Sequence, residues 1–488
     1  MGDLTGKIEH VVVLMLENRS FDSMLGSLYP KGPEFDGLSG NEAIPHTGQG
    51  DVRVWSSNAT DPQSMSIPDP DPGELWMDIN MQLFGLNGAP GNQLPAMNGF
   101  VDNYVRQTNG PPASYKPESI MHYYDPTQVP VISQLAKQFA VCDQWFASAP
   151  CQTWPNRFFL HCATAGGYEN NSPTHFPYMM DTVFNRLEEA GKPWKIYFHD
   201  FPQTLTLTKL WPYIDHFHLI DEFLDDAKSG NLPAYTFIEP RYFPDVVLPN
   251  DQHPPHNVVM GEELISSVYN AVRSSPVWKN TLLIIIYDEH GGCYDHAPPP
   301  TAVPPDDSNP QPFGFDRYGV RIPAVLISPY IKPGTILRAV PDGNLPHNGP
   351  PYPFDHTSVY ATLRKCFGLS GPLTNRDAVA PNLEDVLNMD SPDNDGPPSV
   401  TALPYSMTES DIQKALNAPL NDFQKGLHEA AFYLPPLGLT QDVENMADRI
   451  DDHVKNIVDK TLGDVPSHNT PVEALPLIKD KLKAYFGW

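Results

Sequence analysis

Two short acidic strings stand directly after apolar runs, and their side chains offer the oxygen donors that divalent cations prefer. Glu17 and Asn18 follow the run IEHVVVLML, and Asp288 and Glu289 follow the run TLLIIIY. Carboxylate and amide oxygens suit hard cations. The two strings are therefore candidate ligands of one metal ion.

The position of both strings at the ends of predicted strands indicates that they meet. In a parallel sheet the carboxyl ends of the strands lie at one edge, where open α/β sheets bind their ligands. Carboxylates that stay charged in a partly dry crevice repel one another, and a cation is the simplest way to offset that repulsion. A single string would also fit an exposed loop with a turn at Gly291-Gly292, but two strings at one edge favour a metal site.

Thr153 opens the string TWPNR, which precedes the apolar segment FFLHCATAG. Proline suits the first turn of a helix, so this string predicts a helix start with free backbone N–H groups. These groups and the helix dipole favour a phosphate, and a metal could hold the threonine oxygen deprotonated for attack. An isolated threonine at such a position more often only caps its helix. Thr153 is thus the candidate nucleophile, with capping as the alternative.

Four histidines in polar, proline-rich loops are candidates for handling a phosphoryl group. They are His253, His256, His296 and His356. Imidazole can bind phosphate oxygens or protonate a departing alkoxide. The chain contains 17 histidines, and any one of them is more often structural than catalytic, so this choice needs support beyond the pattern.

The elements that must position these residues follow the pattern of parallel βαβ architecture, in which short aliphatic runs alternate with segments of helical period. The predicted strands are residues 8–16, 195–199, 236–239, 281–287 and 324–328. The predicted helices are VISQLAKQFAV at 131–141, the Asp181-capped TVFNRLEEAG ending at Gly191, Asn257 to Arg273, and HTSVYATLRKCFGL at 356–369. Together they predict an α/β sandwich with a mainly parallel central sheet.

Two stretches depart from this alternation. Residues 30–120, approximately, are rich in Gly, Pro, Asn and Asp, which predicts long loops covering the edge of the sheet. After residues 391–399 the sequence becomes helical, with two apolar stripes: Ile412, Leu416, Leu420, Phe423 and Leu427, then Val443, Met446, Ile450, Val454, Ile457 and Val458. We therefore expect a catalytic domain at 1–395 and a C-terminal helical lobe at 396–488.

The totals limit the partners of the chain. Its 488 residues can bury a large core plus an accessory lobe, and no apolar stretch reaches the ~20 residues that cross a bilayer. The formal charge of -28 repels polyanions, which argues against a nucleic-acid partner. The apolar run near the N-terminus lacks the cleavage site of a secretory signal. We expect a cytoplasmic protein, or one exported without a cleaved N-terminal signal, that touches membranes only transiently.

The five cysteines show no disulfide or zinc framework. They are odd in number and lack the CxxC spacing of metal sites: Cys142, Cys151, Cys162, Cys293 and Cys366. Buried free thiols are the preferred interpretation. A bridge between Cys142 and Cys151 is the alternative in an oxidising compartment.

Four strings occur in an order and spacing typical of one family: ENRSFD, TWPNR, D-x-H-P and DEHGGCYDHAPPP. The chain resembles the phosphoesterase family that contains bacterial phosphatidylcholine-type phospholipases C, plant non-specific phospholipases C and a related bacterial acid phosphatase. The resemblance covers residues 8–370, approximately, and is specific because four separate strings agree. It implies an alkaline-phosphatase-like three-layer sandwich.

The resemblance also implies a metal site and a covalent mechanism. One divalent ion would be held by Glu17, Asn18, Asp288 and Glu289, and Thr153 would carry a phosphothreonine intermediate that water later resolves. All-oxygen ligation favours calcium, magnesium or manganese, whereas a histidine in the shell would favour zinc.

The remaining candidates divide into two sets. The predicted catalytic histidines, which bind the phosphoryl group or protonate the leaving alcohol, are His253, His296 and His256. The predicted substrate contacts are Asn156, His356 and Trp154. Trp154 or Trp145 would receive a cationic choline by cation–π attraction, unless these tryptophans belong to the core.

The expected function is that of a phospholipase C, which hydrolyses glycerophospholipids to diacylglycerol and a phosphorylated headgroup. A phosphomonoesterase of broad specificity is the alternative within the family, because the same metal and nucleophile serve both reactions. A lobe without activity that binds lipid or protein is the alternative outside it. The intact set of Thr153 and four oxygen-bearing ligands argues against that last reading.

Overall fold

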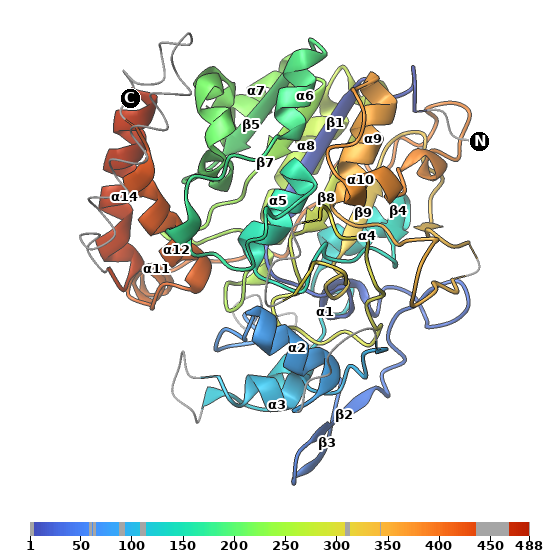
Figure 1. Cartoon of the computed structure of the whole chain (residues 1–488), viewed down its shortest axis with the longest axis vertical. Helices are drawn as coiled ribbons and strands as arrows, with labels where there is room; N and C mark the ends of the chain where they lie inside the picture. The colour runs from blue at the N-terminus through green and yellow to red at the C-terminus, as the bar shows by residue number, and fades with distance from the viewer. Residues whose placement is uncertain are drawn as a thin grey trace.

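The computed structural model describes residues 4–57, 61, 65–86, 93–107, 114–307, 313–341, 343–435 and 468–487. These residues form a three-layer α/β/α sandwich with an insertion at one end and helices from the C-terminus along one side (Figure 1). The expected α/β sandwich with a mainly parallel sheet is confirmed. Among the described residues, no helix is long and apolar enough to cross a membrane.

The central sheet has eight strands in the order β10-β4-β9-β8-β1-β7-β5-β6. Their bounds are β1 His10–Leu16, β4 Ala140–Cys142, β5 Trp194–Phe198, β6 Phe217–Leu219, β7 Tyr235–Ile238, β8 Thr281–Tyr287, β9 Ala324–Ile327 and β10 Thr335–Leu337. Within the described part of the chain, β9 alone runs antiparallel to its neighbours, β4 and β8. The other pairings are parallel.

The central pair β1 and β8 sets the geometry of the site. Both strands are almost entirely apolar because helices cover both faces of the sheet, so neither shows alternation. They pair in parallel, and their last residues, Leu16 and Tyr287, are direct partners. The residues that follow, Glu17 and Asp288, therefore leave the sheet side by side.

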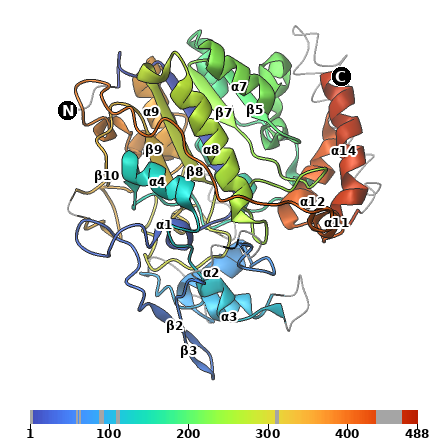
Figure 2. The ribbon, with the colours of Figure 1, turned by 180° about the vertical axis from the view of Figure 1, so that it is seen from behind.

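Helices cover both faces of the sheet (Figures 1 and 2). On one face lie α5 Thr153–Cys162, α6 Val183–Glu189, α9 Thr357–Phe367 and α10 Asn375–Val379. On the other face lie α4 Pro130–Gln138, α7 Ile220–Ser229 and α8 Val258–Ser274. Short 3-10 helices connect the elements: η3 Ser119–Met121, η4 Pro173–His175, η5 Gln203–Thr206, η6 Thr208–His216, η7 Trp278–Asn280, η8 Glu384–Val386 and η9 Ala431–Tyr433.

The predicted strands and helices are present, with two corrections to the helices. The segment 131–141 is helical only to Gln138, because Ala140–Cys142 pairs with β9 and β10 as β4. Helix α6 is capped by Thr182, whose side chain accepts a hydrogen bond from Asn185 N, whereas Asp181 forms ion pairs with Lys209 and Arg186. Strand pairing thus ends the first helix early, and the hydroxyl of Thr182 sets the start of the second.

The insertion is more regular than its composition predicts. Between residues 30 and 120 lie β2 Ala43–His46, β3 Gly50–Arg53, α2 Trp76–Phe84 and α3 Phe100–Tyr104, after the short helix α1 Phe21–Leu25. A separate apolar cluster that includes Ile79, Leu83 and Phe100 holds these elements together. In Figure 1 the insertion lies below the sandwich, beyond α1.

The C-terminal region is helical, as expected, but its first apolar stripe is divided. Helices α11 Glu409–Leu416 and α12 Asp422–Ala430 are separate, because Asn421 caps α12 and Leu420 lies between them. Helix α14 spans Pro471–Phe486. The second predicted stripe, from Val443 to Val458, lies outside the described residues.

The five cysteines are free thiols. Four are buried and Cys366 is half-buried, as the preferred interpretation held. The alternative bridge between Cys142 and Cys151 is absent.

Candidate active site at the strand ends

The candidate site lies where the carboxyl ends of β1 and β8 meet the start of α5. The hydroxyl of Thr153 lies 3.4 Å from Glu17 Oε2 and 3.3 Å from Asn18 Oδ1. Helix α5 is preceded by Gln152, whose side chain makes no capping hydrogen bond, and the first turn is capped instead by Asn171, whose Oδ1 accepts from Trp154 N at 2.8 Å. Thr153 therefore faces the strand ends and does not cap its helix, which removes the alternative role predicted for it.

Arg157 lies one turn after Thr153 on α5 and holds the other oxygen of Glu17. Its Nε donates to Glu17 Oε1 at 3.0 Å, and its Nη2 donates to the same oxygen. The rings of Tyr242 and Phe423 lie 5.5 and 6.0 Å from the guanidinium carbon. Arg157 thus leaves Glu17 Oε2 pointing at Thr153.

Asn18 is the best-fixed residue of the site. Its backbone has a φ of 56°, and its N–H donates to Asp288 Oδ1 at 2.9 Å. Its side-chain Nδ2 donates to Glu74 Oε1 at 2.7 Å and to Glu289 Oε1 at 2.9 Å. These two acceptors orient the amide so that Oδ1 faces Thr153.

Asp288 has one satisfied and one unsatisfied oxygen. Oδ1 accepts from the backbone N–H groups of Asn18 and Glu289, whereas Oδ2 is buried and has no hydrogen-bond partner in the described part of the chain. The charge of Asp288 acts on the buried carboxyl of Glu17 and raises its pKa. An unpaired carboxylate oxygen beside a second buried carboxylate requires a proton or a cation.

The electrostatics of the site agree with this requirement. Burial raises the pKa of Glu17 well above its usual value, against the attraction of Arg157, and the charge of Asp288 raises it further. Burial also raises the pKa of Asp288 and that of Glu289. A divalent cation would favour the charged forms of all three groups.

The donor set fits a cation only in part. Glu17 Oε2, Asn18 Oδ1, Thr153 Oγ1 and Asp288 Oδ2 are available oxygens. Glu289 is engaged elsewhere, because its Oε2 accepts from Gly291 N at 2.9 Å and lies 3.0 Å from His290 Nδ1. The oxygen donors favour calcium, magnesium or manganese.

Two other groups of acidic and histidine side chains lie closer together than the predicted metal set. Among the described residues, Asp71, Glu74 and His253 form one such group, and Asp22, Asp295 and His296 form the other. The first adjoins the site, because Glu74 contacts Asn18. The charges of the second are offset by Arg321, which pairs with Asp295 and Asp22 at 3.0 Å each.

His253 and His256 lie on the insertion side of the site. His253 Nδ1 lies 2.6 Å from the carbonyl oxygen of Pro254, and its Nε2 is 3.7 Å from Glu74 Oε1. Burial lowers the pKa of His253 to about 3, so its imidazole is neutral. His256 Nδ1 lies 2.7 Å from Asp251 Oδ1, which leaves its Nε2 directed elsewhere.

His296 and His356 have structural partners. Both ring nitrogens of His296 are engaged, Nδ1 by Asp22 at 2.6 Å and Nε2 by Asp36 at 3.0 Å. His356 Nε2 lies 2.6 Å from the carbonyl oxygen of Asp288. In these positions His296 has no nitrogen left for a phosphoryl group, and His356 supports the backbone that carries Asp288.

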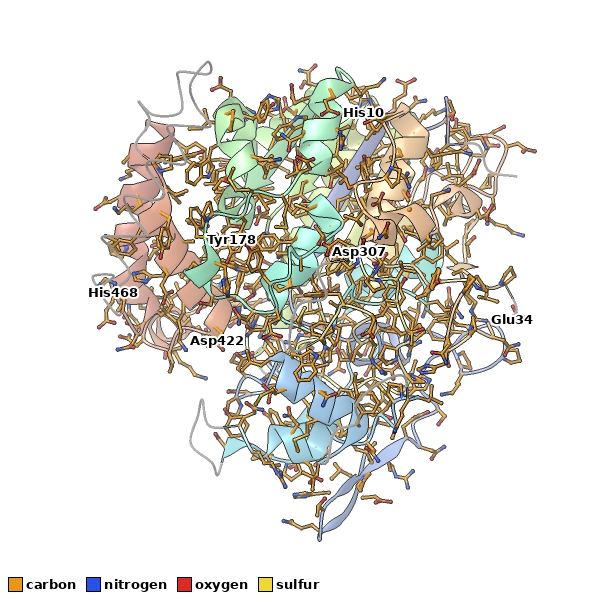
Figure 3. The ribbon with its side chains drawn as sticks, viewed as in Figure 1. His10, Glu34, Tyr178, Asp307, Asp422 and His468 are labelled. Carbon is orange, nitrogen blue, oxygen red and sulfur yellow. The ribbon has the colours of Figure 1, made fainter. Side chains whose placement is uncertain are left out.

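Asn156 and Trp154 also lie inside the protein. The Asn156 amide bonds the backbone of Ala149 and Cys151, which shapes the turn before α5. Trp154 is fully buried and packs edge-on against Tyr178, which is labelled in Figure 3. Trp145 is equally buried and stacks on Phe354. Both tryptophans therefore belong to the core, and neither ring is open to a choline.

Two residues of the site were not predicted as functional. Glu74 stands in the proline-rich string DPDPGELW, where nothing marks one acid among several. Arg157 had a usable signal, because a residue four positions after Thr153 on a helix shares its face. A buried arginine beside a predicted acidic strand end could have been paired with Glu17 on that basis.

A threonine hydroxyl that faces buried carboxylates at the carboxyl edge of a mainly parallel sheet is an arrangement that suits the hydrolysis of phosphate esters. The chain belongs to the Phosphoesterase family, whose model matches residues 8–370. The family expected from the four strings is confirmed.

Named relatives share most of their length with the chain. Non-specific phospholipase C3 of Arabidopsis thaliana is 40% identical over 457 residues, covering 89% of this chain and 83% of its own. Phospholipase C B of Mycobacterium tuberculosis is 30% identical over 458 residues, covering 82% and 81%. The plant match is longer than the family model, so the similarity continues past residue 370 into the C-terminal region.

Solved structures resemble the chain only distantly. A protein in the alkaline phosphatase superfamily from Vibrio parahaemolyticus has a TM-score of 0.34 and 11% identity, and the match covers 78% of this chain and 71% of that one. This similarity is too low to carry a conclusion about the site.

Proposed function

We propose that the chain is a metal-dependent phospholipase C-type phosphodiesterase that uses Thr153 as its nucleophile. The observation that carries this proposal is the position of the Thr153 hydroxyl, 3.3 and 3.4 Å from oxygens of Asn18 and Glu17 at the end of β1. The names of the relatives from Arabidopsis thaliana and Mycobacterium tuberculosis support a phospholipid substrate.

The residues of this chain divide the chemistry among them. Thr153 attacks phosphorus, and its own backbone N–H at the start of α5 stabilises charge on a nonbridging oxygen, because Trp154 N already donates to Asn171 Oδ1 and Pro155 has no N–H. Asn18, fixed by Glu74 and Glu289, holds its carbonyl oxygen toward the nucleophile. The reaction then breaks the phosphorus–oxygen bond to the leaving alcohol, and water later resolves the phosphothreonine.

Glu17, Asn18 and Asp288 would hold the divalent ion through the three oxygens that face Thr153 or lack a partner. Such an ion polarises the phosphoryl group and lowers the pKa of a bound hydroxyl. Arg157 supports the ligand set from behind, because it fixes the position of Glu17. Calcium, magnesium and manganese suit these ligands, whereas zinc would call for a histidine among them.

His256 is the better of the two insertion-side histidines for protonating the leaving alcohol. Asp251 fixes its Nδ1, an arrangement that orients an imidazole for proton transfer through Nε2. His256 also lines a cavity of about 680 Å³ between the insertion and the C-terminal helices. Asp71 and Asp422 line the same cavity, and Asp422 is labelled in Figure 3. The cavity offers space for the organic part of the ester.

The test compares a phosphodiester lipid with a simple monoester. The purified protein is assayed with phosphatidylcholine and with p-nitrophenyl phosphate, before and after EDTA treatment, alongside elemental analysis for bound metal. Hydrolysis of the lipid to diacylglycerol, lost with EDTA and restored by one metal, is expected. Activity on the monoester alone would make the protein a phosphatase. If both activities and bound metal are absent, the protein is instead a module that binds lipid or protein without catalysis.

A further inference from the structure

Helix α2 and the residues around it expose an unusual amount of apolar surface. Met77 is 72% exposed, Leu94 is 60%, Leu75 is 43% and Leu86 is 40%. Ten large apolar side chains are exposed among the described residues, and four of them lie within this stretch of twenty residues. Single exposed apolar residues are common, but a concentration of them marks an interaction surface.

The packing of α2 explains why these side chains remain outside. Ile79 and Leu83 occupy its buried face, in the apolar cluster of the insertion. Met77, Met81 and Phe84 follow one another at spacings of four and three, which places them along a different face that is exposed or half-buried. Phe84 also packs against the apolar cluster of the insertion, whereas Met77 at the start of this face is exposed and contributes nothing to that cluster.

The sequence of the same surface is uncharged in an otherwise acidic protein, and one cation reaches it from elsewhere: the guanidinium carbon of Arg317 lies 4.8 Å from the centre of the Phe84 ring, and its Nη1 donates to the carbonyl oxygen of Gln93. Between Ile79 and Val101 the sequence contains no Asp, Glu, Lys or Arg, although the chain has 59 acidic residues and a net charge of -28. The one acid of α2, Asp78, is turned inward, where its Oδ1 accepts from Asn103 Nδ2 and Gln107 Nε2 at 2.8 Å each.

The exposed residues adjoin the candidate active site. Leu75 follows Glu74 directly, and Glu74 accepts the hydrogen bond that orients Asn18. Trp76 stacks on Phe313 with ring centroids 5.8 Å apart and an angle of 18° between the rings, so a second loop supports the start of α2. A body resting on this surface would therefore lie close to the residue that orients Asn18.

We propose that Leu75, Trp76, Met77, Leu86 and Leu94 form the surface by which the protein rests on an uncharged, zwitterionic lipid layer. This inference depends on the proposed function for its substrate, a lipid drawn from that layer into the site. Apolar side chains beside a neutral face insert into the boundary between headgroups and acyl chains. The charge of -28 opposes both an anionic membrane and a second copy of the chain, and a zwitterionic surface avoids that repulsion.

The test measures binding to sonicated phosphatidylcholine vesicles by co-sedimentation. All proteins carry Thr153→Ala, so the vesicles are not hydrolysed. Met77→Asp is expected to weaken binding on the order of tenfold or more, because a methionine leaves the apolar layer and a charge would have to enter it. Met77→Trp is expected to strengthen it, since tryptophan favours the membrane interface. Vesicles containing phosphatidylserine should bind the protein less well.

Leu224→Asp is the matched control. Leu224 is 36% exposed on α7, at the end of the molecule opposite α2 in Figure 1. This substitution adds the same charge and should leave vesicle binding unchanged. If Met77→Asp and Leu224→Asp reduce binding equally, net charge explains the effect and the surface is refuted. Concentration-dependent dimers lost in Met77→Asp, with vesicle binding intact, would also refute it by identifying a second copy as the occupant.

The outcome separates this inference from the proposed function. Met77→Asp is also made as a single substitution in the protein that keeps Thr153. Its rate of hydrolysis is measured with a monomeric short-chain phosphatidylcholine and with phosphatidylcholine vesicles. A loss confined to vesicles supports the surface. Equal hydrolysis of vesicles by wild type and Met77→Asp refutes the surface while the phospholipase activity stands. Vesicle binding that depends on Met77, in a protein without lipase activity, supports the surface and refutes the function.

Discussion

At the scale of single residues, the site depends on the hydrogen bonds that fix each side chain around Thr153. Thr153 is fully buried, yet among the residues that the structure describes its hydroxyl has only Glu17 and Asn18 as partners, at distances long for hydrogen bonds. Arg157 fixes Glu17, and the carboxylates of Glu74 and Glu289 fix Asn18. Backbone N–H groups fix Asp288. The oxygen of Thr153, the proposed nucleophile, is thus held less firmly than the residues around it, and such a rigid surrounding suits transition-state stabilisation.

Replacing Thr153, the proposed nucleophile, should remove turnover without unfolding the protein. Thr153→Ala is expected to lower kcat by at least about a thousandfold, while Thr153→Ser should keep measurable activity because it keeps the hydroxyl. Circular dichroism in the far ultraviolet should match wild type for both variants, since the side chain caps no helix. Hydrolysis by Thr153→Ala at a rate near wild type would remove Thr153 as the nucleophile.

His296 should contribute stability that depends on pH. Burial alone would lower its pKa, but the charge of Asp22 and the hydrogen bonds to Asp22 and Asp36 raise it to about 9 from 6.5. Because the pKa is higher in the folded state, the contribution is full below about pH 6.5 and is lost as the pH rises through 9.

The measurement compares wild type with His296→Gln in urea at a series of pH values. The difference in the free energy of unfolding should be largest at pH 6, on the order of 3 kcal/mol at most, and should shrink toward pH 10. A difference that is constant over this range would show that the imidazole is not charged in the folded protein.

At the scale of elements, the turn after β8 is where the backbone is most tightly confined. Gly291 has a φ of 60°, and a Cβ at this position would lie 2.0 Å from the carbonyl oxygen of Asn18. The turn therefore packs against the residue that orients its amide toward Thr153. Only glycine allows both the left-handed conformation and this close approach.

Gly291→Ala should therefore lower activity by about a hundredfold or more, because the added methyl group must push Asn18 away from its position beside Thr153. Gly334→Ala is the matched control, since Gly334 has a φ of 73° but open space around it. The control should lose only about 1 kcal/mol of stability and no activity. Equal loss of activity in both variants would indicate that backbone strain, rather than contact with Asn18, is responsible.

The elements that carry the catalytic groups were predictable from the sequence because their signals are local. Strands β1 and β8 are uninterrupted apolar runs, and an acid after each run identifies the carboxyl edge. The insertion was misjudged as loops because its apolar residues are spread among Gly, Pro and Asn, and only their joint cluster in space makes them a core. Glu74 could not be found for the same reason, since its partner Asn18 is 56 positions away.

The roles of the histidines were less predictable than their positions. His296 stands in the string YDHAPPP, which shows no sign that both nitrogens will meet carboxylates from Asp22 and Asp36. Those partners come from segments about 260 residues earlier in the chain. Burial and pairing over such separations decide whether an imidazole is available, and neither is visible in a single sequence.

At the scale of the whole molecule, the C-terminal helices are part of the main core rather than an appended lobe. Tyr485 and Phe486 of α14 contact Trp211 and Phe198, and Phe423 of α12 packs on Tyr242. The segment before them follows α8, where Ser266 Oγ donates to the carbonyl oxygen of Val400 at 2.7 Å. The predicted boundary at residue 395 therefore separates no independent core.

The full chain should accordingly unfold in one cooperative calorimetric transition. A protein ending at residue 395 should aggregate or lack a thermal transition, because aromatic surfaces now covered by α12 and α14 would face water. Removal of Phe423 would also bare the guanidinium of Arg157 on one side. Two separate transitions in the full chain, or a native circular dichroism spectrum for the shortened one, would contradict this.

The parallel pairing of Leu16 with Tyr287 has a consequence for how sequences of this kind can diverge. Consecutive side chains of a strand alternate between faces, so a single residue gained or lost within β1 or β8 would turn the next acid away from its counterpart. The lengths of these two strands are thus locked together, whereas the stretch from β2 to α3 can lengthen or shorten wherever Glu74 still arrives at Asn18. Gaps in an alignment of relatives should gather in that stretch and spare the two strands.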